Sequence, residues 1–325
     1  MMLMLMRMAK AISNRPRRGR LLAPTCALLF CGACIGELDT ASQDHDLRVL
    51  ALKADPPECY LGRDEARFRL TALVADVEAG ALVERPRHYR VSTCPDPEGG
   101  RCEGRAGELV LGEGTFSGET FALDFAFGAS HAALLEAALR ADAYHGFGGL
   151  PVTLAVKVWT DAATEYAAKS IVLQLPTLSL EGEPANENPP APVVLVNGAP
   201  IAADGSLAVA ARSLELDVDP AARAEKPDYR VPTFTGGALT LHESWTYAWF
   251  STRGAYAPES TGGLNPVSQA DLAVATTLQL DDDDEPGPFV SWVVLRDGRG
   301  GVSWTRFAGR FEALPEEPTP EQLIH

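Results

Sequence analysis

Methionine and acidic residues are both missing from long parts of this sequence of 325 residues. No methionine follows Met8, and no aspartate or glutamate precedes Glu37. The chain also lacks a predominantly apolar run of about 20 residues, which a membrane-spanning helix needs, and this excludes a multi-span membrane protein. Hydrophobic residues nevertheless make up 46% of the chain and charged residues 22%, which is ordinary for a folded protein with a buried core.

Positive charge is scarce over the body of the chain. Lysine and arginine number 28 against 44 aspartates and glutamates, so the formal net charge is −16. Six of the basic residues lie before position 34, which leaves 22 against 44, or −22, for the remainder. A surface this acidic repels phosphate backbones, so we expect no nucleic-acid partner. It also repels anionic lipid headgroups, so the body should project from a membrane rather than lie on it.

The motifs that mark several common catalytic centres are missing. The chain has no GxSxG nucleophile elbow, no GxxxxGK[ST] phosphate loop and no HExxH zinc pair, and its six histidines are scattered. We therefore expect a protein that is not an enzyme and carries no cofactor. A hydrolase with an unrecognised site remains an alternative, and it would need two carboxylates, or a serine and a histidine, that meet in a pocket.

Residues 1–33 have the composition of a secretory signal peptide. A basic segment is followed by the uncharged run Leu21–Ala33, which is too short to span a membrane. A basic segment, a short apolar segment and small residues before a cleavage point are typical of such signals. We therefore expect export through the Sec route and removal of residues 1–33.

The end of this segment resembles a bacterial lipobox, in which small residues precede a cysteine that becomes acylated. Gly32 and Ala33 supply the small residues, and Cys34 supplies the acceptor thiol. The resemblance implies a lipid-anchored protein, with residues 34–46 as a polar tether to the folded part. Ile35 stands where an aspartate would favour the inner membrane, so the same resemblance implies the outer membrane. A plain signal peptide with an incidental cysteine remains the alternative.

Three further cysteines suit an oxidising compartment. Cys94 and Cys102 bracket a turn-rich segment, and we expect a disulfide that closes this loop. A bond between Cys59 and Cys94 is the alternative, because it would join the start of one strand to the end of another. No paired histidine or CxxC accompanies these three cysteines, so we expect no zinc site.

Residues 47–180 are predicted to form a β-sandwich. Several runs place apolar residues at every second position, which is typical of strands with one buried face. Such runs include Phe68 to Val74, Phe121 to Phe127 and Val152 to Val158. With the neighbouring segments they give about seven strands, the number that an immunoglobulin-like sandwich needs.

One helix is expected within this domain, over residues 130–142. Leu134, Leu135, Ala138 and Leu139 share one helical face, and Gly146 ends the run. This apolar face predicts packing across one end of the sandwich rather than a ligand site.

The segment 181–192 is rich in proline, asparagine and glutamate and predicts a linker. A second β-series covers 193–313, and the glycine-rich turn Arg296–Gly301 joins its last two strands as a hairpin. Residues 314–325 form an acidic, proline-rich tail.

The predicted fold class is therefore mostly β, with two immunoglobulin-like sandwiches after a signal peptide, the first with an inserted helix.

Several stretches resemble PKD-like and other bacterial immunoglobulin-like modules. Trp245–Gly254 is similar to their tryptophan-bearing strand, and Val294–Trp304 is similar to their closing V-x-D-G-x-G-G hairpin. Leu47–Glu58 and Phe68–Asp76 look like the first two strands of such a module. The whole layout resembles predicted envelope lipoproteins of high-GC Gram-negative bacteria, and the resemblance implies a role in adhesion, binding or envelope structure.

Two groups of residues are candidate ligand sites. The first is the acidic run Asp281, Asp282, Asp283 and Asp284. Grouped carboxylates suit Ca²⁺, but neighbours in an extended run point in opposite directions, so a solvated loop is the simpler interpretation. The second group comprises four tryptophans, Trp245, Trp249, Trp292 and Trp304. Exposed, they would form a sugar-binding platform; strand alternation favours a place in the sandwich core instead.

Taken together, these features predict a lipid-anchored protein of the cell envelope with a non-catalytic binding or structural role. Its partners would be the membrane, through the anchor, and a protein or a glycan. The alternative from a different class is a carbohydrate-binding or adhesive module, dependent on Ca²⁺ or not. Exposed aromatic rings in a concave site would favour that alternative.

Overall fold

The computed structural model describes residues 46–62, 65–175, 178, 180, 182–201, 206–223, 226–280 and 285–312. All of them fall within one structural unit, Thr40–His325. The predicted signal peptide, Cys34, the acidic run 281–284 and the tail 314–325 lie outside the described residues. Within the described ranges, no helix has the length and apolar character needed to cross a membrane.

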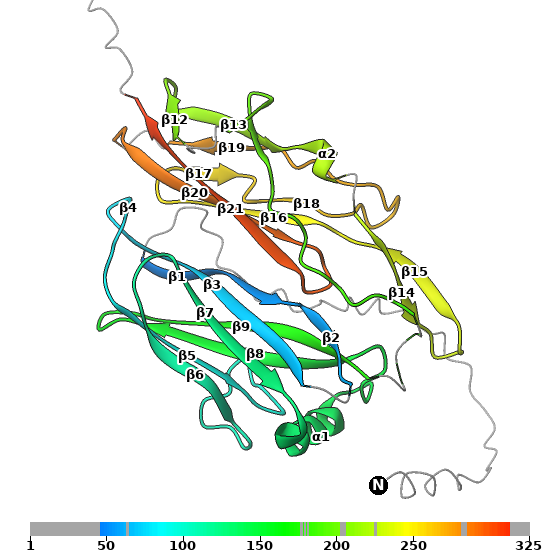
Figure 1. Cartoon of the computed structure of the whole chain (residues 1–325). Helices are drawn as coiled ribbons and strands as arrows, with labels where there is room; N and C mark the ends of the chain where they lie inside the picture. The colour runs from blue at the N-terminus through cyan, green and yellow to red at the C-terminus, as the bar shows by residue number, and fades with distance from the viewer. Residues whose placement is uncertain are drawn as a thin grey trace, which may run out of the picture. The chain divides into compact units, whose positions relative to one another are not determined.

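The first module is a sandwich of two sheets (Figure 1). Its strands are β1 Asp46–Asp55, β2 Glu58–Tyr60, β3 Ala66–Glu78, β4 Ala81–Leu82, β5 Arg87–Thr93, β6 Leu109–Phe116, β7 Thr120–Phe127, β8 Leu150–Trp159 and β9 Thr164–Gln174. One sheet holds β1, β3, β4 and β7, and the other has the order β2-β9-β8-β5-β6. The predicted runs in β3, β7 and β8 are confirmed as strands.

The period-two pattern of the sequence explains how these two sheets pack. Phe68, Leu70, Ala72 and Val74 lie at alternate positions of β3, and all four are buried. They join buried residues of β1, β7, β8 and β9 in one hydrophobic cluster between the sheets. Alternate positions of a strand point to one face, so the apolar set of each strand reaches the same core.

The predicted helix is also present. A short 3-10 turn, η1 Ala129–His131, leads into α1 Ala132–Ala141, which lies between β7 and β8 in the chain. Leu135 and Ala138 of α1 are buried in the cluster of the first module, and Leu134 and Leu139 pack against it. The helix covers one end of the sandwich (Figure 1), as its apolar face predicts.

The second module is another two-sheet sandwich. Its elements are β10 Val194–Val196, β11 Ala199–Pro200, β12 Ser206–Val209, β13 Ser213–Val218, α2 Pro220–Arg223, β14 Asp228–Pro232, β15 Ala238–His242, β16 Thr246–Ser251, β17 Ala255–Ala257, β18 Ser260–Gly262, β19 Thr276–Gln279, β20 Pro288–Arg296 and β21 Val302–Phe311. The sheets have the orders β11-β10-β13-β19-β17 and β12-β21-β20-β16-β18, and a second hydrophobic cluster lies between them. Strands β20 and β21 form the predicted hairpin.

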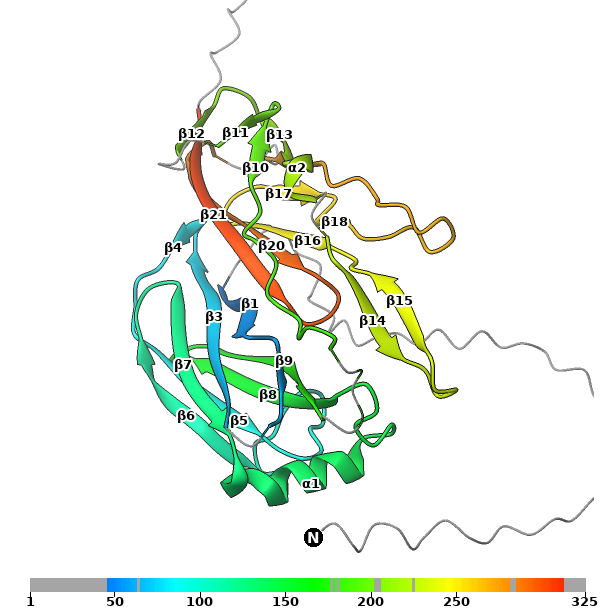
Figure 2. The same ribbon diagram turned by 45° about the vertical axis from the view of Figure 1, so that its right-hand side comes forward.

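Both modules repeat one strand arrangement. The order β2-β9-β8-β5-β6 corresponds to β12-β21-β20-β16-β18, and β1-β3-β7 corresponds to β10-β13-β19. In each module the short strand β2 or β12 pairs in parallel with the last strand, whereas the other pairs are antiparallel. This two-sheet arrangement is immunoglobulin-like. Beyond this shared arrangement, the first module carries α1 and the second carries the hairpin β14–β15, which Figure 2 shows as a separate two-stranded arm.

A third hydrophobic cluster, which we call the inter-module cluster, lies between one sheet of each module. The first module contributes Leu50, Ala51, Leu73, Ala75 and Val77, and the second contributes Phe250, Trp292, Val294 and Val302. Strands β1, β3, β16, β20 and β21 therefore bury residues on both faces. Burial of a large apolar side chain is worth about 1.5–3 kcal/mol, so this cluster couples the two modules energetically.

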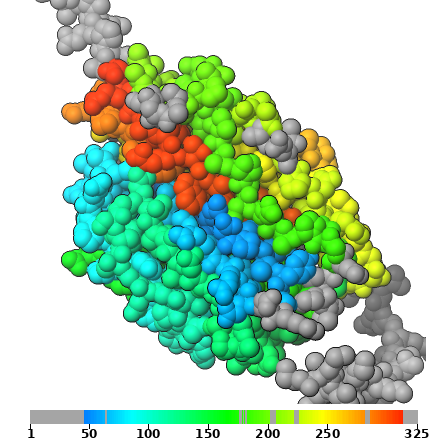
Figure 3. All heavy atoms as spheres, viewed as in Figure 1, coloured from blue at the N-terminus to red at the C-terminus, as the bar shows by residue number. Residues whose placement is uncertain are grey.

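The seam segment, 182–193, comprises the described part of the predicted linker, 182–192, and Val193, and it runs along the seam between the modules. Asn188 Nδ2 donates to the carbonyl oxygen of Ala54 at 2.8 Å, and Ser303 Oγ donates to that of Pro190 at 2.8 Å. Figure 3 shows this green segment beside the blue strands β1 and β2 and the red strand β21. The segment has no regular secondary structure, but its hydrogen bonds fix it to both modules.

The disulfide expected from the cysteine spacing is present. Cys94 and Cys102 are bonded to each other, and both are buried. Cys59, the alternative partner, keeps a free thiol. The bond closes the turn-rich loop between β5 and β6.

We expect the two modules to unfold together. Leu73→Ala in the first module and Val294→Ala in the second remove apolar groups from the same cluster, and each should destabilise the protein, Leu73→Ala by about 2–5 kcal/mol. Both should shift one common transition in urea unfolding followed by tryptophan fluorescence and far-UV circular dichroism.

The matched control is Leu239→Ala in β15, where the leucine is 52% exposed, and it should cost less than about 0.5 kcal/mol. Two separate transitions, each sensitive to only one of the two core variants, would contradict the coupling.

The disulfide should contribute about 2–3 kcal/mol in the chain-entropy model. The double variant Cys94→Ala/Cys102→Ala should therefore unfold at lower urea concentration than the native chain. Dithiothreitol should destabilise the native chain and leave the double variant unchanged. An unchanged native midpoint under reduction would show that the bond adds nothing to stability.

Candidate functional site

The turn between β20 and β21 places a buried carboxylate at the junction of the modules. Asp297 is 1% exposed, and its Oδ1 accepts hydrogen bonds from the N–H groups of Arg299 at 2.7 Å and Gly301 at 2.8 Å. A Cβ at Gly301 would lie 2.2 Å from Asp297 Oδ2, so only glycine fits at this position. The glycine-rich turn thus forms a hairpin and also encloses a negative charge.

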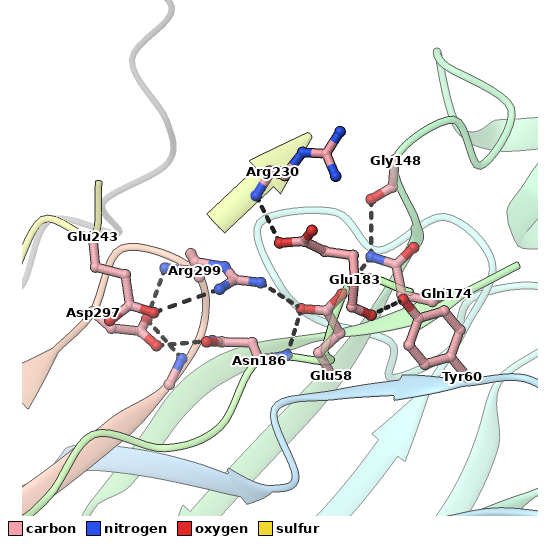
Figure 4. Close-up of polar contacts among 11 residues, drawn as sticks. Glu58, Tyr60, Gly148, Gln174, Glu183, Asn186, Arg230, Glu243, Asp297 and Arg299 are labelled. Atoms are coloured by element: carbon pink, nitrogen blue, oxygen red, sulfur yellow. Dashed lines mark hydrogen bonds and ion pairs between the residues drawn. The ribbon is translucent and has the colours of Figure 1, made fainter. Parts of the chain in front are cut away.

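Arg299 extends from this turn into a group of carboxylates (Figure 4). Its Nη2 lies 3.2 Å from Glu58 Oε2 in the first module, and its Nη1 lies 3.5 Å from Glu243 Oε1 in the second. The guanidinium carbon also lies 4.1 Å from the ring centroid of Tyr229 in β14. Arginine suits this position because its planar fork can pair with two carboxylates while it stacks on an aromatic ring.

Glu58 of β2 is a second buried carboxylate, 6% exposed. Gln174 Nε2 donates to its Oε1, and the backbone N–H of Asn186 donates to its Oε2 at 3.0 Å. Asn186 Nδ2 also donates to Asp297 Oδ2 at 2.8 Å, so this one residue of the seam segment connects two carboxylates. Removing one partner from such a network typically costs about 3–5 kcal/mol, because the remaining charge stays buried.

Glu243 and Lys169 complete what we call the junction network. Trp245 Nε1 donates to Glu243 Oε2 at 2.8 Å, and burial raises the pKa of Glu243. Lys169 Nζ, from β9, donates to the carbonyl oxygen of Gly300 in the β20–β21 turn. Burial lowers the pKa of Lys169 to about 8, although the charge of Asp297 opposes this shift.

A pocket of about 170 Å³, the junction pocket, opens beside this network. It is lined by Glu58, Tyr60, Gly148, Val172, Gln174, Leu180, Glu183, Tyr229, Arg230, Val231, Pro232 and Arg299. The hydroxyl of Tyr60 donates to the carbonyl oxygen of Glu183 at 2.5 Å, and Glu183 Oε1 accepts from the N–H of Arg230 at 2.8 Å (Figure 4). One wall is therefore the first module and the other is the inserted hairpin β14–β15.

Three aromatic residues, Tyr144, Phe147 and Phe234, are close in sequence to residues that line the pocket. Phe234 at the tip of the hairpin stacks on Phe147, with ring centroids 4.5 Å apart, and approaches Tyr144 at 6.0 Å. Phe234 is 77% exposed and Tyr144 is 63% exposed. Phe147 precedes the pocket residue Gly148, and Phe234 lies two residues after the pocket residue Pro232, so the rings lie beside the pocket.

The four tryptophan candidates do not form an exposed platform. Trp245, Trp249 and Trp292 are between 0 and 2% exposed. Trp304 is half-buried and packs against the inter-module cluster. The core interpretation is therefore the observed one, because Trp249 of β16 and Trp245, which precedes β16, both lie in the hydrophobic cluster of the second sandwich.

The residues of the junction escaped prediction because they come from distant parts of the chain. Glu58, Asn186, Glu243 and Arg299 lie in four separate segments, and only the folded chain brings them together. The turn Arg296–Gly301 was the one available signal, and its pattern predicts a hairpin without indicating what the charged side chains contact. Within the described ranges, no group of three or more histidine, cysteine, aspartate or glutamate residues is placed to hold a metal ion.

Comparisons with known proteins assign no family. No family model matches the chain, and no curated protein matches it. Among solved structures, red sea bream transglutaminase aligns with 82% of this chain at 10% identity and a TM-score of 0.23, and the match covers 32% of that chain. The two tandem V-type regions of VCBP3, a v-region-containing chitin binding protein, align with 82% of this chain at 10% identity and a TM-score of 0.25, covering all of that chain. Similarities this weak carry no argument about function.

Lys169 should give the stability a specific pH dependence. The pKa of Lys169 is about 8 in the folded protein, and its ordinary value, which applies to the unfolded chain, is 10.5. Between about pH 8 and pH 10.5 the unfolded chain therefore binds more protons at this lysine than the folded protein does. The free energy of unfolding should therefore rise with pH across this window, by up to roughly 3 kcal/mol relative to Lys169→Met.

The measurement is the free energy of unfolding in urea of both proteins at about pH 7 and about pH 10. The change in this free energy between the two pH values is then compared between the native chain and Lys169→Met. This difference cancels the contribution of tyrosines and other lysines that titrate in the same window. Equal slopes for the two proteins would show that Lys169 is not a buried cation at the junction.

Proposed function

We propose that this protein is a lipid-anchored component of the cell envelope, in the outer membrane, and that it acts by binding or as a structural element rather than by catalysis. Cys34 after Gly32 and Ala33 supports the anchor, and residues 34–46 would space the modules from the membrane. The strongly acidic composition supports a body that projects away from anionic headgroups.

The observation that carries the non-catalytic role is the saturation of the buried carboxylates at the junction. Both oxygens of Glu58 accept hydrogen bonds, from Gln174 on one side and from Asn186 and Arg299 on the other. Both oxygens of Asp297 are engaged in the same way. A general acid, base or nucleophile must instead reach its substrate.

This saturation bears on the hydrolase alternative, which requires two carboxylates in one pocket. Glu58 and Glu183 both line the junction pocket. Glu58, however, is tied into the pairing of the two modules, so its protonation or attack on a substrate would disrupt the junction. A binding role leaves these contacts intact.

A carbohydrate-binding or adhesive function is the second candidate. The tryptophans do not support it, but the junction pocket with Tyr60 and the exposed rings beside it does. Dependence on Ca²⁺ through Asp281–Asp284 remains a prediction from the sequence.

The anchor is tested by intact mass spectrometry of the membrane fraction. The native mass should correspond to a chain that begins at Cys34 and carries acyl groups. Cys34→Ala should lose both the acyl mass and the membrane association.

Cys59→Ala is the matched control, because it removes a free thiol from the folded part and should leave the anchor intact. A native protein that is unmodified and soluble would overturn the lipoprotein proposal.

A further inference from the structure

The junction pocket has the walls of a small-ligand site. Strand β14 supplies Tyr229, Arg230, Val231 and Pro232, and the first module supplies Tyr60, Val172 and Gln174. Pockets for drug-sized ligands usually measure about 300–1,000 Å³, so about 170 Å³ suits a small ligand or one unit of a longer chain. The mixture of aliphatic, aromatic and polar side chains is typical of recognition sites.

The polar groups that remain available carry one charge of each sign. Glu58 and Glu243 pair with the guanidinium of Arg299, which removes it from ligand binding. The guanidinium of Arg230 makes no hydrogen bond or ion pair with any described residue, and Figure 4 shows it extending away from Glu183. Glu183 offers the acceptor, because within the described part of the chain only its Oε1 accepts a hydrogen bond, which comes from the N–H of Arg230.

This balance favours a neutral ligand with hydroxyl groups. A hydroxyl both donates and accepts, so one such ligand can satisfy the Arg230 guanidinium and the Glu183 carboxylate together. Anionic polymers are disfavoured by the formal charge of −16. Cationic ligands are disfavoured by the positive charge of Arg230, which lines the pocket.

Exposed aromatic surface beside the polar groups adds a second requirement. Tyr60 is 37% exposed in the pocket wall, and Phe234 and Tyr144 are 77% and 63% exposed next to it. Aromatic side chains offer large apolar faces, and such rings grouped at a surface mark interaction sites. A sugar ring combines an apolar C–H face with a rim of hydroxyls, so it matches both parts of the site.

We propose that the junction pocket, together with the ring of Phe234, binds a neutral oligosaccharide, with one sugar unit in the pocket and its neighbour against the hairpin tip. This assignment rests on the proposed non-catalytic binding function and gives it a ligand class. Arg230 and Glu183 bind hydroxyls, and Tyr60 and Phe234 pack on the sugar rings. The hairpin β14–β15 forms one wall, so the binding site exists only where the second module meets the first.

The test uses the mature protein purified from whole cells, together with neutral oligosaccharides of glucose, mannose and N-acetylglucosamine. An acidic oligogalacturonate serves as the charged comparison. Binding is detected by saturation-transfer NMR, and Kd is measured by calorimetry. At least one neutral oligosaccharide should bind, and the oligogalacturonate should bind more weakly.

Two variants locate the site. Arg230→Ala should weaken binding by at least about tenfold, because it removes one hydrogen bond to a charged group. Phe234→Ala should weaken binding by about two- to tenfold, because it removes the aromatic contact with the sugar ring. Arg140→Ala on α1, where the arginine side chain is 72% exposed, and Leu239→Ala on the same hairpin as Phe234 are the matched controls and should bind normally. All four altered side chains are exposed, so folding should be preserved, and circular dichroism checks this.

The result that overturns the proposal is the absence of binding by every neutral probe at millimolar concentration. Equal affinity of the native chain, Arg230→Ala and Phe234→Ala would also overturn it, and so would binding of the oligogalacturonate alone. The anchor is read separately by the mass of the same preparation. An acylated protein without saccharide binding refutes only the ligand assignment, and a saccharide-binding protein without acyl groups refutes only the anchor.

Discussion

The burial of two sheets on both of their faces is the constraint on which the rest of this structure depends. Each of the two sandwiches has its own hydrophobic core. Here Leu73 of β3 and Trp292 of β20 belong to a third cluster between the modules. This cluster brings β2, the seam segment 182–193 and the β20–β21 turn close enough for direct hydrogen bonds. The junction network and the junction pocket both follow from that proximity.

The junction network gives this apolar contact a defined register. Hydrophobic burial is not directional, whereas the hydrogen bonds of Asp297 and Glu58 are satisfied only in one relative placement of the turn, the seam segment and β2. Arg299 then connects these carboxylates to the hairpin through Glu243 and the ring of Tyr229. The hairpin wall of the pocket is in this way held by the contacts that hold the modules together.

Much of the fold could be predicted because local patterns determine it. The alternation in β3, β7 and β8 predicts one buried face, the apolar stripe of α1 predicts a helix at the sandwich end, and the cysteine spacing predicts the disulfide. The pairing of modules was missed, although a signal exists: the unbroken apolar runs Ala72–Ala75 and Trp292–Leu295 are typical of strands buried on both faces. The site itself could not be predicted. Glu58 and Arg299 are far apart in the chain, and a single sequence does not indicate which charged residues meet.

The most direct measurement of the central claim is native-state hydrogen exchange of two amides at the junction. The N–H of Asn186 donates to Glu58, and the N–H of Val302 donates to Asn188 Oδ1 at 2.9 Å. Both lie in or beside irregular segments, so their protection depends on the pairing of the modules. If the modules form one unit, both amides should exchange only through global unfolding, with the same free energy as the core amides of β3 and β20. Exchange as fast as that of an exposed loop would show that the modules separate freely, and it would contradict this account.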